Sequence, residues 1–125
     1  MMRLFLALGA IFGGLSVAGG AFASHALQGR LSERSLEIFE TGTRYQMYHA
    51  LALILVALLL LNNESEGQSL LMASGTAMTI GVLLFSGSLY ALSFTDIKIL
   101  GAITPLGGVA FLIGWGCLAI AAFKL

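Results

Sequence analysis

Long apolar stretches separated by short polar segments dominate the pattern of this chain. The apolar stretches cover residues 4–24, 47–61, 69–94 and 99–123. Three of them have the roughly 20 residues that a helix needs to cross a hydrocarbon core about 30 Å thick. The shorter stretch 47–61 reaches that length when polar residues before it join the helix in the headgroup region, so we expect this second span at about 44–61. The pattern predicts four spans, at about 4–24, 44–61, 69–94 and 99–123, with both termini on one side.

Two of the three connections between these spans are short. Residues 62–67 (NNESEG) join the second span to the third, and residues 95–98 join the third to the fourth. Such short links force neighbouring helices to run antiparallel. We therefore predict an all-α fold, an integral membrane four-helix bundle that forms a single domain over residues 1–125.

The connection between the first and second spans is longer and contains a helical pattern of its own. Over residues 32–43, apolar positions such as Leu36 and Phe39 recur at helical spacing, and charged residues occupy the other side. Ser32 suits an N-cap, and Glu33 in the first turn complements the helix dipole. We predict a short amphipathic helix at the membrane interface, between spans 1 and 2, that can run into the second span.

The N-terminal segment also resembles a secretory signal peptide, because Arg3 precedes an apolar run that ends in AFA at 21–23. This run is longer than the usual apolar core of such signals, so we expect the segment to be retained as the first span. Basic residues are more numerous on the side of the long connection than on the side of the termini. The positive-inside rule then favours the connection 25–43 in the cytoplasm, for a protein of the bacterial cytoplasmic (inner) membrane.

Composition supports a membrane protein and excludes some partners. The chain is 58% hydrophobic and 10% charged, whereas soluble domains carry about 25% charged residues. Basic and acidic residues cancel, so no basic surface is available for nucleic acid, and we expect the lipid bilayer as the main partner. The single cysteine, Cys117, has no second thiol in the chain with which to form a disulfide or a CxxC metal site.

Glycine is frequent for a helical chain, at 16 residues. In membranes, small residues allow helix backbones to approach closely. The positions that we expect to mediate packing are Gly9, Gly13 and Gly20 on one face of the first span, Gly81 in the third span, and Pro105 as a kink or local opening in the fourth. We interpret these positions as packing within the bundle, with a homo-oligomer seam as the alternative.

Polar side chains gather at one end of the first two spans, and ionisable groups beside spans are functional candidates because they are costly to bury unpaired. The candidates are His25, Glu40, Arg44, Gln46, Tyr48 and His49. Two histidines at one membrane level can bind a metal or haem or relay protons, but a metal site needs further ligands at defined spacing. We interpret the group as a structural polar cluster or possible ligand pocket, and expect no metal and no cofactor.

Two specific contacts follow from this interpretation. We predict that Arg44 bridges Glu40 or the carbonyl end of the first span, and that His25 and His49 face a common polar pocket. No nucleophile is paired with a base in a recognisable motif, so we expect no enzymatic activity.

A resemblance to a known family covers essentially the whole chain. Residues 19–59, GGAFASHALQGRLSERSLEIFETGTRYQMYHALALILVALL, with the later GSLYAL and GAITPLGG stretches, resemble the YgdD-like family of small bacterial inner-membrane proteins, a domain of unknown function with relatives in mitochondria. The resemblance implies a four-span membrane protein whose recurrent polar residues are the six candidates above. Some members are associated with membrane integrity and stress tolerance.

The sequence is compatible with three functions. The first is a non-enzymatic membrane protein that supports membrane integrity or organisation, or serves as an accessory subunit of a larger membrane complex. The second is a small channel or transporter that works as an oligomer, with the glycine faces as its seam. The third is a haem- or quinone-binding accessory subunit of a respiratory complex, which His25 and His49 would serve.

Overall fold

Four helical spans build the molecule. The computed structural model describes residues 1–62 and 66–125. The elements are α1 (Met2–Phe22), η1 (Ala23–Leu27), α2 (Glu33–Leu61), α3 (Gln68–Gly81), η2 (Val82–Ser86), α4 (Gly87–Thr95), η3 (Lys98–Ala102) and α5 (Thr104–Ala122). Here η1 and η2 are π-helical turns and η3 is a 3-10 turn. Over the described residues, four helices are long and apolar enough to cross a membrane, which confirms the predicted all-α four-span fold.

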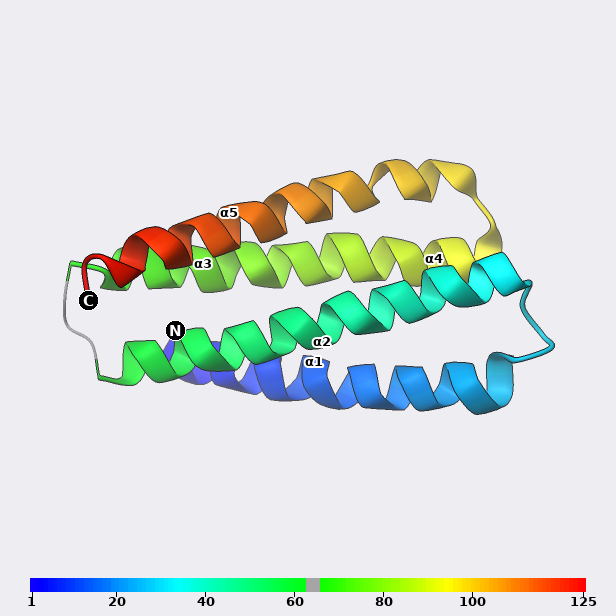
Figure 1. Ribbon diagram of the computed structural model, residues 1–125, viewed down its shortest axis with the longest axis horizontal. Helices are drawn as coiled ribbons and strands as arrows, with labels where there is room; N and C mark the ends of the chain where they lie inside the picture. The colour runs from blue at the N-terminus through cyan, green and yellow to red at the C-terminus, as the bar shows by residue number, and fades with distance from the viewer. Residues whose placement is uncertain (63–65) are drawn as a thin grey trace.

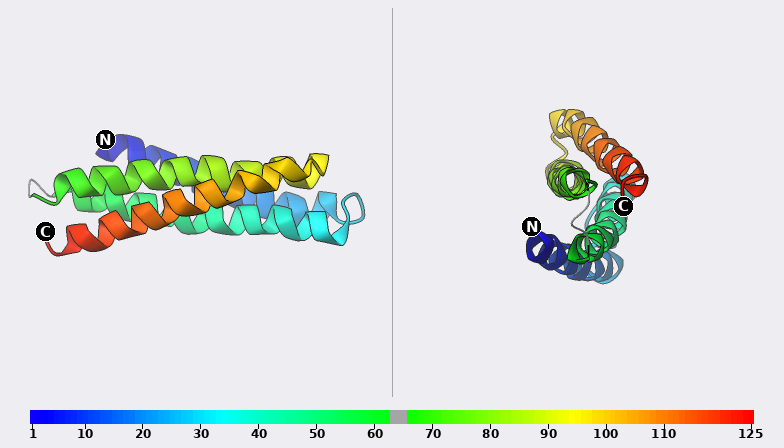
Figure 2. Two further views of the ribbon diagram at one scale, coloured as in Figure 1. Left: turned by 90° about the horizontal axis from the view of Figure 1, so that it is seen from above. Right: turned by 90° about the vertical axis from the view of Figure 1, so that its left-hand side faces the viewer.

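The spans run antiparallel in two side-by-side pairs, as Figures 1 and 2 show. In one pair α1 packs against α2, and in the other α5 packs against α3 and η2, while α2 contacts α3 and α4 to join the pairs. Both chain termini lie at one end of the bundle, which we call the terminal end (Figure 1). The opposite end, which holds residues 28–32 and 96–98, is called the connection end. The predicted polar turn at 62–67 includes residues 63–65, which lie outside the described residues.

The amphipathic segment is not a separate helix. Ser32 is the N-cap, as predicted, because its Oγ accepts a hydrogen bond of 3.1 Å from the backbone N–H of Ser35. From Glu33 the helix then continues unbroken to Leu61, so the expected short helix at 32–43 forms the first turns of the second span. Gly42 lies near the end of the 32–43 segment, and the ring of Tyr90 packs against it, 2.7 Å from an added Cβ.

Two apolar clusters form the core, and buried polar residues lie between them along α2. The larger cluster includes Phe5, Leu53 and Met78, and the smaller one surrounds Phe39 near the connection end. Between Phe39 and Leu53, the side chains of Gln46 and His49 are also buried. The interior therefore has a polar layer in the stretch where the two pairs of helices meet.

The predicted packing glycines differ in what they contact. Gly9 lies against α2, where an added Cβ would be 2.7 Å from Ile54 Cγ1, and Gly13 faces the same helix at the ordinary distance of 3.9 Å from Ala50 Cβ. Gly81 lies against the Phe111 ring of α5. For Gly20 the prediction is wrong, because no described atom lies within 4 Å of an added Cβ. The neighbouring Gly19, and not Gly20, lies against α2, where an added Cβ would be 3.0 Å from Thr43 Cγ2.

Pro105 does not kink the interior of a span. It lies in the first turn of α5, where the missing N–H removes no helical hydrogen bond. The local opening that we predicted is the interruption between η3 and α5 at Ile103.

Candidate functional site

Gln46 connects three helices through its amide group. Its Nε2 donates a hydrogen bond of 2.8 Å to the carbonyl oxygen of Phe12 in α1. Its Oε1 accepts a hydrogen bond of 2.6 Å from the Tyr90 hydroxyl in α4. The side chain is 5% exposed, so both ends of a buried amide have partners supplied by the protein.

His49, one turn further along α2, is held in the same way between α2 and α5. Trp115 Nε1 donates to His49 Nε2 at 3.0 Å, and His49 Nδ1 lies 2.7 Å from the carbonyl oxygen of Tyr45. Because an indole N–H only donates, Nε2 accepts, and Nδ1 carries the proton and donates to the carbonyl oxygen of Tyr45. The imidazole also stacks on Phe111, with ring centroids 3.5 Å apart and planes within 9°. Both ring nitrogens of this neutral imidazole are therefore engaged.

Serine hydroxyls extend these contacts to the other helix interfaces. Ser86 Oγ, in η2, donates to the carbonyl oxygen of Gly42 at 2.7 Å, and Ser74 Oγ donates to that of Gly114 at 2.7 Å. Each bond joins a side chain to a backbone carbonyl of a neighbouring helix. Together with Gln46 and His49, these serines show that the interior polar groups bond mainly to other parts of the same chain.

The predicted pocket shared by the two histidines does not form. His25 is exposed at the connection end in η1, whereas His49 is 4% exposed and is turned toward Phe111 and Trp115. The sequence places both residues near the same end of the first two spans, but on α2 His49 faces α5 and not α1. Among the described residues, no three of His, Cys, Asp and Glu are grouped to hold a metal ion.

The predicted contacts of Arg44 also fail. Within the described chain, the ion pair within 4.0 Å is Lys124–Glu66, at 3.9 Å, and not Glu40–Arg44. Arg44 is exposed and makes no hydrogen bond to another described residue. Tyr48 is likewise exposed, at 51%, with its ring edge against Tyr45. Helical spacing permits the Glu40–Arg44 pair, but hydration of the exposed Arg44 and the half-buried Glu40 competes with it.

Glu40 and Arg44 instead line a groove of about 350 Å³ between α1 and α2. Its walls are Ser16, Val17, Gly20, Ser24, Glu40, Thr43, Arg44 and Met47. Gly20 opens this groove because it has no side chain, and Ser16 Oγ is buried there without a hydrogen-bond partner in the described residues. We call this hollow the α1–α2 groove.

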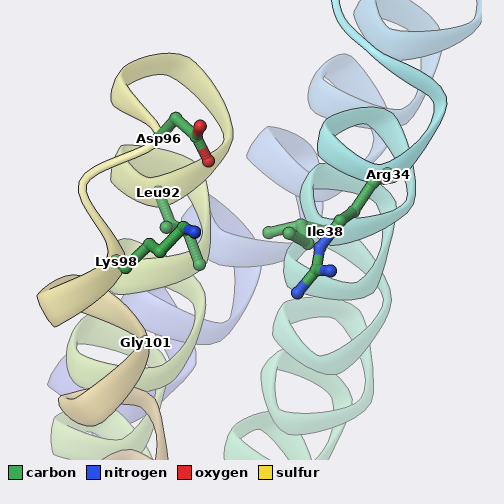
Figure 3. A pocket seen from close by; sticks show the side chains of 6 residues that line it. All are labelled: Arg34, Ile38, Leu92, Asp96, Lys98 and Gly101. Carbon is green, nitrogen blue, oxygen red and sulfur yellow. The ribbon is translucent and has the colours of Figure 1, made fainter.

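A second hollow lies at the connection end, between the first turns of α2 and the junction of α4 with η3. Its volume is about 430 Å³, and its lining residues are Arg34, Ile38, Leu92, Asp96, Lys98 and Gly101. Figure 3 shows Arg34 on one side of the gap, with Asp96 and Lys98 on the other. We call this hollow the connection-end pocket.

Sequence reasoning identified the buried polar residues of α2 but missed their partners. Tyr90 and Trp115 complete the bonds of Gln46 and His49 from helices far along the chain. Tyr90 lies in the GSLYAL stretch that carries the family resemblance, which was the available signal for it. Trp115 is the one tryptophan of the sequence, and its place in an apolar span gave no indication of its partner.

Comparisons with known proteins place the chain among bacterial membrane proteins. The family model described as "Protein of unknown function (DUF423)" matches residues 19–108. The UPF0382 membrane protein YwdK of Bacillus subtilis (strain 168) is 49% identical over 123 residues, which cover 98% of each chain. The UPF0382 membrane protein SAB0533 of Staphylococcus aureus is 45% identical over 125 residues, again 98% of each chain. No solved structure matches the chain.

Proposed function

This chain belongs to the DUF423 family of membrane proteins, and from that premise we propose that it is a non-enzymatic, multi-pass protein of the bacterial cytoplasmic membrane that organises the surrounding lipid. The observation that carries the proposal is the way its polar groups are divided. Apart from Ser16, the buried polar side chains described above bond one another or backbone carbonyls, whereas Arg34 and Lys98 line a hollow at the surface of the connection end.

The interior polar layer supports a structural role over a catalytic one. Gln46 and His49 are the most buried of the polar residues that we singled out, and each has both ends of its polar group satisfied by the protein. A group that acts as a base or nucleophile must present a free atom to its substrate. These two residues present none, so their arrangement favours stability and correct helix packing.

The alternatives have weaker support from the same contacts. A haem ligand would have to bind iron through a free imidazole nitrogen, but Tyr45 and Trp115 engage both nitrogens of His49. A proton-coupled transporter would use an acid or base within its spans. The sequence has no such residue in the apolar interior of the first, third or fourth span.

The family resemblance gives additional support. Some YgdD-like proteins are associated with membrane integrity, and a bundle that binds lipid at its connection end provides a direct physical route to such a role. A place as accessory subunit in a larger membrane complex uses the same exposed surfaces.

The experiment that tests this proposal measures lipid order and solute flux together. The full chain is reconstituted into vesicles of phosphatidylethanolamine and phosphatidylglycerol, and acyl-chain order is followed by the anisotropy of a membrane probe. We expect higher order than in protein-free vesicles, without leakage of ions or of a small dye. The matched control contains an equal mass of an unrelated four-span protein. Unchanged order, or ion flux above the control, would overturn the proposal.

A further inference from the structure

We propose that the connection-end pocket binds the phosphodiester of an anionic phospholipid with a hydroxylated headgroup. The inference rests on the proposed function and names the lipid class and the residues that recognise it. Arg34 reaches the pocket from α2, and Lys98 reaches it from the start of η3, so the two cations come from the two different pairs of helices. Figure 3 shows both side chains directed toward the gap between these elements.

The charges of this pocket do not cancel. It has two cations, Arg34 and Lys98, against one carboxylate, Asp96. In the described part of the chain, none of the three forms an ion pair within 4.0 Å. The planar guanidinium of Arg34 matches two phosphate oxygens, and the ammonium of Lys98 adds a compact charge. A ligand group with a single negative charge, as in a phosphodiester, balances the excess positive charge.

Asp96 gives the pocket selectivity among anionic groups. It ends α4 in the left-handed conformation, with φ 53°, and its carboxylate faces the gap in Figure 3. An ionised carboxylate accepts hydrogen bonds from hydroxyl groups, and it repels additional negative charge. Asp96 therefore favours a glycerol-type headgroup and disfavours the more highly charged monoester of phosphatidic acid.

The surroundings of the pocket favour a lipid over a free anion. Ile97 and Ile99 flank Lys98 and are 52% and 74% exposed, and Ile38 and Leu92 line the pocket itself. Exposed isoleucines on both sides of a lysine suit the boundary between headgroups and acyl chains, where the stem of lysine lies along apolar groups. A lipid phosphate at this level places its glycerol and first methylenes beside these residues, which inorganic phosphate does not use.

Native mass spectrometry of the full chain in detergent tests the proposal. The protein is mixed with equal amounts of phosphatidylglycerol and phosphatidylcholine, and the ratio of the two bound lipids is measured. We expect a preference for phosphatidylglycerol that falls about fivefold in Arg34→Gln or Lys98→Gln, and more than tenfold in the double variant. In Asp96→Asn we expect increased binding of phosphatidic acid relative to phosphatidylglycerol.

Two matched controls separate this pocket from general charge effects. Arg3→Gln removes a cation at the terminal end, and Arg44→Gln removes one from the α1–α2 groove, so both should keep the wild-type preference. Near-wild-type melting curves are expected for all six variants, because these side chains make no buried contacts of the kind seen for Gln46. Excess inorganic phosphate should not displace the lipid.

The outcomes distinguish this inference from the proposed function. Bound lipid without a preference, or an equal loss of preference in Arg44→Gln, overturns the pocket but leaves lipid organisation standing. Displacement by inorganic phosphate overturns the lipid assignment in favour of a small anion. Failure of the protein to order vesicle lipid overturns the proposed function itself.

Discussion

The α1–α2 interface and the α3–α5 interface use the same two elements of packing. In each, a glycine of one helix lies against a side chain of the other, as Gly9 does against Ile54 and Gly114 against Met78. In each, a polar side chain also donates to a backbone carbonyl across the interface, Gln46 to Phe12 in the first and Ser74 to Gly114 in the second. Close approach and a hydrogen bond thus occur together, as expected where lipid provides no hydrophobic driving force between helices.

The two interfaces differ toward the connection end. The second stays closed, because Gly81 packs on Phe111 and Gly107 packs on the backbone of Phe85. In the first, an added Cβ at Gly19 would lie 3.0 Å from Thr43 Cγ2 of α2, but Gly20 beside it borders the α1–α2 groove, where Ser16 Oγ has no hydrogen-bond partner among the described residues. A glycine in a regular small-residue pattern therefore contributes to packing only where another helix reaches it.

Gly107→Ala should destabilise the protein most, because its new Cβ would lie 2.7 Å from the Cα of Phe85, and backbone atoms cannot move aside cheaply. We expect a loss of about 1–3 kcal/mol in the free energy of unfolding. It is measured by SDS titration in mixed micelles, followed by the fluorescence of Trp115. The control is the adjacent Gly108→Ala, since an added Cβ there has no described atom within 4 Å. Equal effects for the two variants would contradict the packing seen at Gly107.

Gln46→Leu should cost about 1–2 kcal/mol, because it leaves the Tyr90 hydroxyl without its acceptor and removes the bond to the Phe12 carbonyl. The same SDS titration measures it. Tyr90→Phe is then added to form a double-mutant cycle. The second substitution should cost less in the Gln46→Leu background than in the wild type. Strictly additive losses would mean that the two side chains are not coupled.

Ser74→Ala should lower stability by about 0.6 kcal/mol, the average for a hydrogen bond between helices in a membrane. Ser16→Ala is the matched substitution in the other interface, and it should cause no loss because this hydroxyl has no partner among the described residues. Parallel titrations of the two variants give the comparison directly. A larger loss for Ser16→Ala would show that its hydroxyl is bonded in the membrane.

Gly20→Ala should have the smallest effect, within about 0.5 kcal/mol of wild type, because its new methyl group enters open space. Thermal melting in detergent, followed by circular dichroism, is sufficient to measure this. Gly9→Ala, on the same helix, should lower the melting temperature clearly, since its Cβ would meet Ala50 O at 2.8 Å. If Gly20→Ala lowered the melting temperature as much as Gly9→Ala does, the interface would be closed at both positions.

The sequence predicts the elements of this fold well because their causes are local. Apolar stretches of membrane length predict the spans, and Ser32 is recognisable as a cap from its position before an amphipathic pattern. The continuous α2 was less predictable. Its polar first turns predicted a short amphipathic helix that could run into the second span, but the sequence did not reveal that the ring of Tyr90, from another span, packs against Gly42 where the two segments join.

The site was less predictable because its contacts depend on the rotation of each helix about its own axis. Sequence spacing gives the depth of His25 and His49 in the membrane, but not the direction in which each one faces. Packing of Phe111 against the imidazole fixes that direction for His49, and this contact joins residues far apart in the chain. For the same reason the sequence identified Gln46 as a buried polar group but did not reveal Tyr90 as its partner.

The π-helical turn η2 divides the third span into two parts whose side chains face different neighbouring helices. Before it, α3 bonds to α5 through Ser74, and after it, α4 bonds to α2 through Tyr90. A π turn accommodates an extra residue, and removing one residue from η2 would rotate α4 by roughly 100° relative to α3. Tyr90 would then be turned away from Gln46. One extra residue thus sets the register of α4 against α2, and shortening η2 by one position would break the bond between Tyr90 and Gln46 while leaving the contacts of α3 with α2 and α5 in place.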